Sequence, residues 1–452
     1  MEILLEPEKW VLDKYSDIKS VSEYKLSDYI IQVKYNNEIL LLHTITWAIY
    51  ILTEYEFKDI LNNSILKQNK VVISNNIDEL KVAHDVYLSR ITKPLPSYEK
   101  IYGFVILTTT ACNARCAYCY ENDIKEKEVM TLETAEKLVQ FLNKKRSNNN
   151  PVHIQWFGGE PLLNKGVIDY IIDRLIELNI SYVCGITTNG FLLNEDVVNS
   201  FKRWNLTTMQ ITLDGLNDEY NSIKNYIYSD IDAFMIVVNN IHNVLEKTET
   251  IVTLRFNVSN DNIFSMYDTI EYLKEEFKEH YNKKIFFYVS PLFEYLKPDI
   301  NIVDGFWEEF NRISTIVKTS KLNKCETLLE TGVFSRDKIN KNCFAYDGVG
   351  ITIMPNGKFT PCEHIRDEDV FGDVVNGVTN FDVIKRWQTF DGPEIQFCKD
   401  SKCPYHPMCP KFFRCDTTVV CTTNKEKERK LDKAKEKLIR TRIVYNNYIN
   451  NK

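Results

Sequence analysis

The 452-residue sequence lacks several features that would place it in broad classes of protein. No apolar stretch approaches the roughly 18–20 residues that cross a membrane as a helix. The first residues, MEILLEPEKW, have no basic segment followed by an apolar run, so we expect no secretory signal peptide. The formal net charge of −7 gives no electrostatic reason to expect nucleic-acid binding. These absences favour a cytoplasmic globular protein, and 452 residues are enough for two or three domains.

Cysteine is absent from residues 1–90 but occurs 12 times in the rest of the chain. Because a reducing cytosol disfavours structural disulfides, so many thiols indicate metal ligands. Three of them, Cys112, Cys116 and Cys119, form a C-x3-C-x2-C run directly after an apolar segment. Three thiolates suit an iron–sulfur cluster and would leave one iron of a four-iron cluster free. The alternative is zinc, which needs a fourth Cys or His close by, and the nearest histidines are remote in sequence.

From residue 101 to about 296, apolar segments typical of strands alternate with segments whose apolar residues recur at helical spacing. Such alternation predicts an α/β fold with a parallel sheet, because each crossover needs a helix. Six strands predict a partial, TIM-like (β/α)6 barrel with its functional groups at the C-terminal ends of the strands. Thr131 and Asn194 are expected helix N-caps. The expected strands are 102–107, 152–157, 181–187, 207–213, 251–258 and 284–292, and the expected helices are 131–146, 166–179, 194–204, 231–246 and 263–280.

Polar and glycine-rich motifs follow the second, third and fourth of these strands. They are Gly158-Gly159-Glu160-Pro161, Thr187-Thr188-Asn189-Gly190 and Thr212-Leu213-Asp214-Gly215. Two glycines allow a ligand to approach the backbone, and Glu160 offers a carboxylate to an ammonium. Thr188 and Asn189 could bind hydroxyls, and Arg255 on the fifth strand could bind a carboxylate. Together these groups predict a site for a ligand with an amine, a carboxylate and a sugar, beside the free iron.

The cysteine run and the three motifs together resemble the radical S-adenosylmethionine (SAM) enzymes over roughly residues 100–300. The resemblance implies that Cys112, Cys116 and Cys119 hold a [4Fe–4S] cluster whose free iron chelates the amino and carboxylate groups of SAM. One electron would then cleave SAM to methionine and a 5′-deoxyadenosyl radical, which abstracts hydrogen from the substrate. The implied SAM contacts are Tyr118 against adenine, Gly158, Gly159 and Glu160 at the amine, Thr188, Asn189, Thr212 (where the family commonly has Ser) and Arg255.

The remaining cysteines lie mostly in the last third of the chain. Cys184 falls inside the third strand, where we expect a buried structural thiol. The spacing Cys343-x13-Gly357-x4-Cys362 resembles the start of a SPASM domain, the auxiliary-cluster extension of radical SAM peptide-modifying enzymes. This chain departs from the family's pattern in two spacings. Four residues separate its third and fourth cysteines, Cys398 and Cys403, where the family has two, and five separate its fifth and sixth, Cys409 and Cys415, where the family has three. The alternative to iron–sulfur clusters in this region is two zinc sites.

The SPASM resemblance implies two auxiliary clusters. Cys343, Cys362 and Cys415 would hold the first, with Cys325 as the candidate fourth ligand. If Cys325 does not reach, a substrate thiolate could occupy the open iron. The second cluster would be held by Cys398, Cys403, Cys409 and Cys421.

Residues 1–90 predict a small winged-helix-like module, with strands at 29–35 and 38–42, a helix at 44–55, a strand at 71–73 and a helix at 77–87. This region is similar to the N-terminal module of peptide maturases, which binds a leader peptide by adding it as a strand. The alternative is that it merely packs on the next domain. The expected domains are therefore 1–90, the radical SAM barrel at 100–300, a linker at 301–342, the SPASM domain at 343–423 and a charged, solvated helix at 424–452.

The resemblance as a whole implies a peptide maturase acting on a ribosomally synthesised precursor, with flavodoxin or ferredoxin as electron donor. The expected product is a thioether between a cysteine sulfur and a carbon of the peptide. A competing hypothesis is a sulfatase-maturating enzyme that makes formylglycine. Those enzymes carry an Asp as general base directly after the second SPASM cysteine. This chain departs from them by having Glu363 there, although a Glu could also serve as the base. Carbon–carbon cross-linking and epimerisation remain open. A hypothesis of another class is an iron–sulfur electron carrier or redox sensor, which would need no amine-binding motif.

Overall fold

The computed structural model describes residues 1–15, 23–91, 103–119, 121, 126–145, 150–229, 231–291, 303–317, 350–363, 367–388, 396–409, 421 and 423–450. These residues form two compact units. One contains the residues up to 91 and those from 396 onward, and the other contains residues 103–317 and 350–388. Of the predicted domain at 343–423, residues 350–388 fall in the second of these units, and Cys398, Cys403, Cys409 and Cys421 fall in the unit with the N-terminal residues. Cys325, Cys343 and Cys415 lie outside the described residues.

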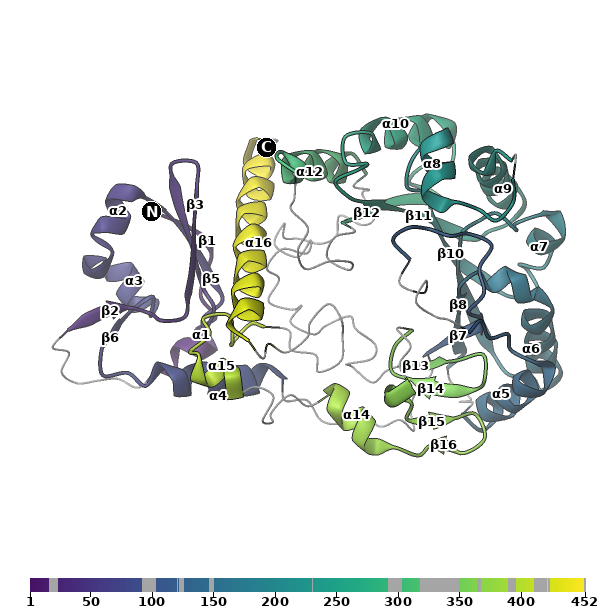
Figure 1. Ribbon diagram of the computed structural model, residues 1–452, viewed down its shortest axis with the longest axis horizontal. Helices are drawn as coiled ribbons and strands as arrows, with labels where there is room; N and C mark the ends of the chain where they lie inside the picture. The colour runs from purple at the N-terminus through teal and green to yellow at the C-terminus, as the bar shows by residue number, and fades with distance from the viewer. Residues whose placement is uncertain are drawn as a thin grey trace. The chain divides into compact units, whose positions relative to one another are not determined.

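The barrel unit, as we call the unit with residues 103–317, is built on six parallel strands that lie side by side in chain order (Figure 1). This large parallel sheet and its crossover helices confirm the predicted α/β fold. Thr131 and Asn194 are N-caps as predicted, since their side chains accept hydrogen bonds from backbone N–H groups at 3.1 and 3.0 Å. The strands are β7 (Gly103–Thr109), β8 (Val152–Gly158), β9 (Tyr182–Thr188), β10 (Leu206–Thr212), β11 (Ile251–Val258) and β12 (Ile285–Pro291).

The helices of the barrel unit cover the outer face of this sheet (Figure 1). Along β8, Ile154 and Trp156 are buried, whereas Gln155 and Phe157 line an inner cavity. This alternation follows from the two-residue period of a strand. The helices are α5 (Leu132–Lys145), η4 (Pro161–Asn164), α6 (Lys165–Glu177), α7 (Glu195–Asn199), α8 (Asn217–Lys224), α9 (Ala233–Lys247), α10 (Met266–Glu276) and α12 (Phe306–Val317). The sequence pattern did not predict η4, α8 or α12.

The predicted cysteine hairpin extends this sheet. Strand β13 (Gly350–Ile353) pairs in parallel with β7, and β14 (Lys358–Thr360) returns antiparallel to β13. Gly357 forms the turn with a φ of +83°, a left-handed conformation that glycine adopts readily. Cys362 follows β14, so this cysteine belongs to the barrel unit. The extension continues with η8 (Asp367–Asp369), β15 (Gly372–Asp373), β16 (Gly377–Val378) and α14 (Phe381–Gln388).

The N-terminal unit, which contains the residues up to 91 and from 396 onward, has a four-stranded antiparallel sheet in the order β1-β5-β4-β3. The predicted strands are confirmed as β3 (Ile30–Tyr35) and β4 (Glu38–His43), but the predicted helix at 44–55 is wrong, because β5 (Ala48–Thr53) is a strand. All of β5 up to Leu52 is buried, because both faces of the sheet are covered. The other elements are β1 (Glu2–Leu5), α1 (Lys9–Leu12), β2 (Tyr24–Leu26), α2 (Glu54–Lys58), η1 (Ile60–Asn62), α3 (Ser64–Gln68), β6 (Val72–Ser74), α4 (Glu79–Ile91) and α15 (Gln396–Asp400).

The C-terminal helix α16 (Asn424–Asn450) covers one face of this sheet. Its charge pattern had predicted a solvated helix, but part of it packs on the sheet. Ala434 and Leu438 are buried in a core that also contains Ile31 and Leu40 of the sheet. The guanidinium of Arg442 donates to the Glu38 carboxylate at 2.6 and 2.8 Å. The charged residues of α16 thus share the helix with an apolar stripe that packs on the sheet. No helix in the described part of the chain is long and apolar enough to span a membrane.

Candidate functional site

The three-cysteine loop begins where β7 ends, at the C-terminal edge of the parallel sheet. The N–H of Cys119 donates to the carbonyl of Cys116 at 3.1 Å, and the N–H of Ala114 points to the Cys112 sulfur at 3.4 Å. All three cysteines are partly buried. Burial raises the pKa of the Cys112 thiol to about 12. A metal centre that binds the thiolate would overcome this cost, because coordination deprotonates a thiol.

The glycine motif after β8 is bonded directly to the cysteine loop. The N–H groups of Gly159 and Glu160 donate to the carbonyls of Thr109 and Ala111 at 3.1 and 2.9 Å. A Cβ atom on Gly159 would lie 2.3 Å from the Ala111 oxygen, and one on Gly158 would lie 2.1 Å from the Thr109 oxygen. Both glycines are therefore required by the close approach of the chain's own loop, a reason that the sequence argument did not contain.

Glu160 is fully buried and joins this motif to the next strand end. Its Oε1 accepts hydrogen bonds from the Thr188 hydroxyl at 2.8 Å and the Leu162 N–H at 3.1 Å, and its Oε2 accepts one from the Asn189 N–H at 2.8 Å. Burial raises the pKa of Glu160 to about 7, although these hydrogen bonds lower it. A carboxylate in such a position gains from the approach of a cation.

Asn189 completes the connection back to the cysteine loop. Its Nδ2 donates to the Asn113 side-chain oxygen at 2.7 Å and lies 3.8 Å from the Cys112 sulfur. The structure thus brings together three of the predicted groups, namely the cysteine loop, the glycine motif with Glu160, and Thr188 with Asn189. They form one contiguous site at the C-terminal edge of the sheet.

Thr212 and Arg255 lie side by side on β10 and β11, where they are register partners. The Arg255 guanidinium donates to Asn257 at 2.9 Å and to the Ser290 hydroxyl at 3.4 Å. Its centre lies 6.0 Å from the middle of the Tyr288 ring. Arg255 therefore lies at the same edge of the sheet, where it can still offer N–H donors to an anion.

Tyr118 belongs to a buried polar group that the sequence argument missed. Its hydroxyl donates to the Asp214 carboxylate and accepts a hydrogen bond from the Lys224 ammonium at 2.8 Å. Lys224 and Asp214 also form an ion pair at 2.9 Å. Burial and the Asp214 charge raise the pKa of Tyr118 well above its ordinary value. The sequence analysis named Asp214 only as part of a motif. Lys224 stands alone on a helix that was not predicted, so nothing in the sequence indicated that it lies at the site.

A cavity of about 380 Å³ lies on the inner side of the parallel sheet. Glu363 reaches it from the extension after β14, and the Cys362 thiol donates to Glu363 at 3.3 Å. A second acidic residue, Glu121, is buried close to Glu363. Burial and the Glu363 charge raise the pKa of Glu121 to about 7, while Lys127 lowers it. The cavity is lined by Val105, Gln155, Phe157, Ile186, Thr187, Thr208, Met209, Gln210, Thr253 and Glu363.

The cysteine pocket, a second sulfur-rich site, lies within the N-terminal unit. Cys398, Cys403, Cys409 and Cys421 are all buried and line one cavity together with Tyr405, Lys427 and Lys430. These are the four thiols that the SPASM resemblance assigns to one cluster. In the described ranges no three His, Cys, Asp or Glu side chains are grouped around a single ion position. The four-thiol donor set itself suits an iron–sulfur cluster.

Arg90 on α4 ties this cysteine-bearing segment to the N-terminal sheet. Its guanidinium donates to the carbonyls of Pro407 and Thr44 at 3.0 and 3.1 Å and pairs with Glu8 at 2.5 Å. It also lies over the Trp47 ring, 4.9 Å from its centre. One buried cation thus joins segments from both ends of the chain. Cys184, in contrast, is buried inside β9, as predicted for a structural thiol.

The parallel sheet with a three-thiol loop and a carboxylate at one edge defines the class of the barrel unit. Residues 106–275 match the family model of the Radical SAM superfamily. The barrel unit therefore contains a radical SAM domain.

Two curated relatives share this part of the chain. The chain is 30% identical over 198 residues to the radical SAM cyclopropyl synthase TigE of Paramaledivibacter caminithermalis, which is 38% of this chain and 41% of TigE. It is 33% identical over 159 residues to the GTP 3′,8-cyclase of Clostridium perfringens, which is 34% of this chain and 47% of the cyclase. The chain thus spans less than half the length of either relative.

The fold is also similar to a solved structure, anSMEcpe with bound AdoMet. The TM-score is 0.52 at 17% identity, covering 75% of this chain and 97% of that protein. Another structure of anSMEcpe, with bound AdoMet and the Cp18Cys peptide, has a TM-score of 0.50 at 16% identity and covers 76% of this chain and 99% of that protein. At these identities the likeness is one of fold.

Proposed function

We propose that this chain is a radical SAM/SPASM maturase that modifies a ribosomally synthesised precursor peptide. The observation that carries the proposal is the bonded junction of three cysteines with a buried carboxylate at the edge of a parallel sheet. In this proposal Cys112, Cys116 and Cys119 hold a [4Fe–4S] cluster. Bound there, the cluster would supply the electron for reductive cleavage of SAM, which starts hydrogen abstraction from the substrate.

The residues around the junction bind and orient SAM. Glu160 accepts hydrogen bonds from the SAM ammonium, and Arg255 pairs with its carboxylate. Thr188, Asn189 and Thr212 offer hydroxyl and amide groups to the sugar, and Tyr118 offers an aromatic face to adenine. Gly158 and Gly159 contribute by letting the two loops approach each other. In this way these residues would hold SAM in one orientation beside the cysteine loop.

The auxiliary cysteines would bind two further [4Fe–4S] clusters. The four buried thiols of the cysteine pocket support one of them. Cys362 is the described ligand of the other, and its remaining proposed ligands are Cys343, Cys415 and Cys325. An auxiliary cluster near the substrate would accept the second electron of an oxidative cross-link. A thioether joins the cysteine sulfur to a peptide carbon with loss of two hydrogen atoms.

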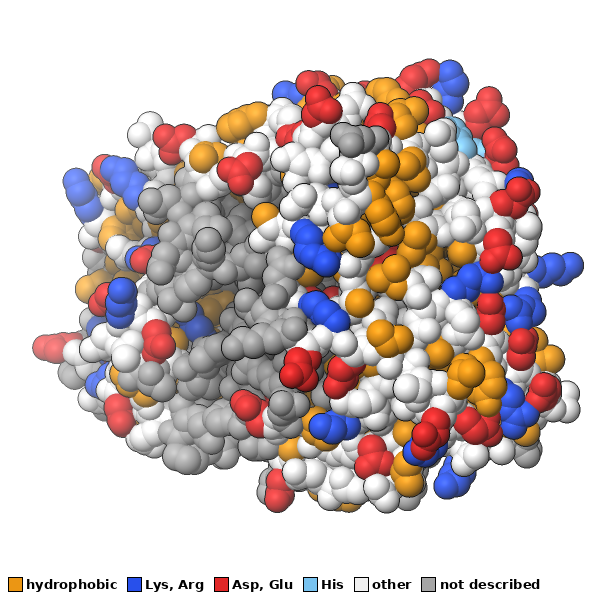
Figure 2. All heavy atoms as spheres, turned by 45° about the vertical axis from the view of Figure 1, so that its right-hand side comes forward, with side chains coloured by type: hydrophobic (Ala, Val, Ile, Leu, Met, Phe, Trp, Pro, Cys, Tyr) orange, Lys and Arg blue, Asp and Glu red, His pale blue; other side chains and the backbone are white. Residues whose placement is uncertain are grey.

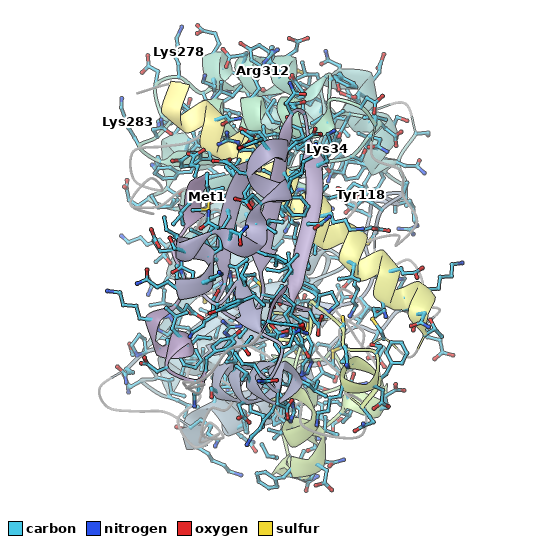
Figure 3. All side chains as sticks on the ribbon, turned by 90° about the vertical axis from the view of Figure 1, so that its left-hand side faces the viewer. Met1, Lys34, Tyr118, Lys278, Lys283 and Arg312 are labelled. Atoms are coloured by element: carbon cyan, nitrogen blue, oxygen red, sulfur yellow. The ribbon has the colours of Figure 1, made fainter. Side chains whose placement is uncertain are left out.

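The N-terminal sheet is the proposed site for the leader peptide. Its edge strands in the described chain are β1 and β3, and an extended peptide can pair with the free edge of a strand. On β3, Gln32 and Lys34 are exposed. Figure 3 shows Lys34 on this strand, at the edge of the sheet. The peptide bound in the anSMEcpe structure supports a peptide as the class of substrate.

A second candidate is the maturation of a sulfatase, in which a Cys or Ser is oxidised to formylglycine. The position of Glu363 favours it, because its carboxylate lines the inner cavity and could remove a proton from a substrate held there. An electron carrier without SAM chemistry is less favoured, since it would not require a buried carboxylate beside the cysteine loop.

We further propose a flavodoxin or ferredoxin as electron donor and the cytoplasm as location. Acidic and basic side chains are interspersed on the face seen in Figure 2.

The proposal is tested by incubating the anaerobically reconstituted protein with SAM, a low-potential reductant and a candidate precursor encoded beside its gene. Mass spectrometry of the peptide then decides between the candidates. A loss of two hydrogen atoms at a cysteine supports a thioether, and an aldehyde at Cys or Ser supports sulfatase maturation. A protein that carries clusters but never cleaves SAM would contradict both.

A further inference from the structure

The C-terminal end of helix α8 is bonded to the cysteine loop at several points. The N–H of Arg115 donates to the carbonyl of Lys224 at 2.9 Å, and the N–H of Ile227 donates to the carbonyl of Asn113 at 3.0 Å. The Cys116 thiol faces the Lys224 carbonyl at 3.9 Å. The cysteine loop is therefore held in place by the short helix α8, which is not part of any motif predicted from the sequence.

The side chain of Lys224 turns back into the same region and is almost completely buried. Its ammonium donates to the Tyr118 hydroxyl at 2.8 Å and pairs with Asp214 at 2.9 Å. It lies 5.5 Å from the centre of the Tyr118 ring and 5.8 Å from that of Tyr220. Lys224 therefore places an ammonium group, paired with the Asp214 carboxylate, next to the cysteine loop.

Asp214 anchors this group to the parallel sheet. Its Oδ1 accepts a hydrogen bond from the N–H of Asn257 at 2.7 Å, and its backbone carbonyl accepts one from the Asn262 side chain at 3.0 Å. Its other carboxylate oxygen binds Tyr118 and Lys224. Both of its carboxylate oxygens thus bind groups within the protein. Taking two charges out of water costs free energy, so stability alone is a weak reason for such a pair.

We propose that Lys224 is a positioning residue for the cluster, an inference that rests on the proposed function. It holds the cysteine loop through its hydrogen bond to the Tyr118 hydroxyl and through its own carbonyl, which accepts from the N–H of Arg115. Lys224 therefore affects how firmly the loop holds the iron of the cluster.

The test compares the wild type with three variants: Asp214→Asn/Lys224→Met, Lys224→Arg and a control. The double variant removes both charges together, and Lys224→Arg keeps the positive charge. Lys224→Met alone is not used, because it leaves the buried Asp214 carboxylate unpaired and can prevent folding. Lys165→Met is the matched control, because Lys165 pairs with Asp169 at 2.8 Å on α6 of the same unit.

Two quantities are measured on the reconstituted full chain. The first is the rate of iron release to a chelator. The second is the midpoint potential of the electron paramagnetic resonance signal that responds to SAM, titrated with dithionite as electron donor. For the double variant we expect unchanged thermal unfolding and iron release faster by roughly two- to tenfold, the equivalent of one net hydrogen bond. The potential should stay near the wild-type value, because the variant removes one positive and one negative charge together. Lys224→Arg and Lys165→Met should behave like the wild type.

A folded double variant with the wild-type release rate would overturn the role of Lys224. Neither measurement needs turnover, so the role of Lys224 and the proposed function can fail separately. A wild type that cleaves SAM while the variants are unchanged contradicts only the Lys224 assignment. A wild type that binds no cluster at the loop contradicts the proposed function and this inference with it.

Discussion

The backbone N–H of Gly159 donates a hydrogen bond to the carbonyl of Thr109 at 3.1 Å, so the glycine motif and the start of the cysteine loop are in direct contact. The neighbouring N–H of Glu160 donates to Ala111 in the same way. The residues expected to hold the cluster and those expected to hold SAM are therefore one structural element. A small change in either loop should disturb both functions.

Gly159→Ala tests this contact. The added methyl group would lie 2.3 Å from the Ala111 oxygen, closer than any real contact allows, so the backbone must move. We expect loss of iron from the three-cysteine loop and weaker SAM binding, measured by iron content and by SAM titration. Gly166→Ala on α6 is the control, because nothing lies within 4 Å of its added methyl group. That change should stabilise the helix by up to about 1 kcal/mol. Equal iron content in both variants would contradict the account.

The pH dependence of SAM binding tests Glu160. Because burial raises the pKa of this carboxyl to about 7, it is largely protonated at pH 6 and largely ionised at pH 8. Only the ionised form attracts the SAM ammonium, so SAM affinity should fall as the pH falls through 7 and binding should release a proton near that pH. Glu160→Gln should bind SAM weakly at every pH. A wild-type affinity that does not change between pH 6 and pH 8 would show that Glu160 does not bind the ammonium.

Arg90 should be essential to the N-terminal unit. Arg90→Ala removes a buried guanidinium and leaves Glu8 without its ion-pair partner, a loss of about 3–5 kcal/mol in the free energy of unfolding. Because the same guanidinium binds the Pro407 carbonyl, iron in the cysteine pocket should fall as well. Arg174→Ala is the control, since Arg174 pairs with Glu136 and Glu177 at the surface, where such pairs contribute at most about 1 kcal/mol. Similar losses in the two variants would contradict this role.

Deletion of residues 1–90 should do more than remove a peptide-binding module. The N-terminal sheet shares its core with α16 and with Met408, so its removal exposes that core. We expect the truncated chain to aggregate or to lose iron from the cysteine pocket, measured by light scattering and iron content. A soluble truncated chain with all its iron would mean that the two regions fold independently.

Much of the barrel unit was predictable because its signals are local. The crossover helices repeat their apolar residues at helical spacing, and Thr131 and Asn194 cap their own helices. The cysteine run and Glu160 carry chemistry in adjacent residues. In each case the sequence near a residue contains the reason for its structure.

The failures arise where the reason lies far away in the chain. Residues 44–55 were expected to be helical, yet β5 is a strand because α16, almost 400 residues later, covers one face of its sheet. The buried group of Tyr118, Asp214 and Lys224 is formed by residues from a loop, a strand end and a helix, and none of them is unusual in its own segment. The close approach that requires Gly158 and Gly159 likewise depends on another loop.

The most direct test of the central claim is the formation of 5′-deoxyadenosine from SAM by the reduced, reconstituted protein. We predict that the wild type forms it and that the triple variant Cys112→Ala/Cys116→Ala/Cys119→Ala does not, while the variant keeps the iron of its auxiliary clusters. Equal formation of 5′-deoxyadenosine by both proteins would contradict the assignment of the SAM-binding cluster to this loop.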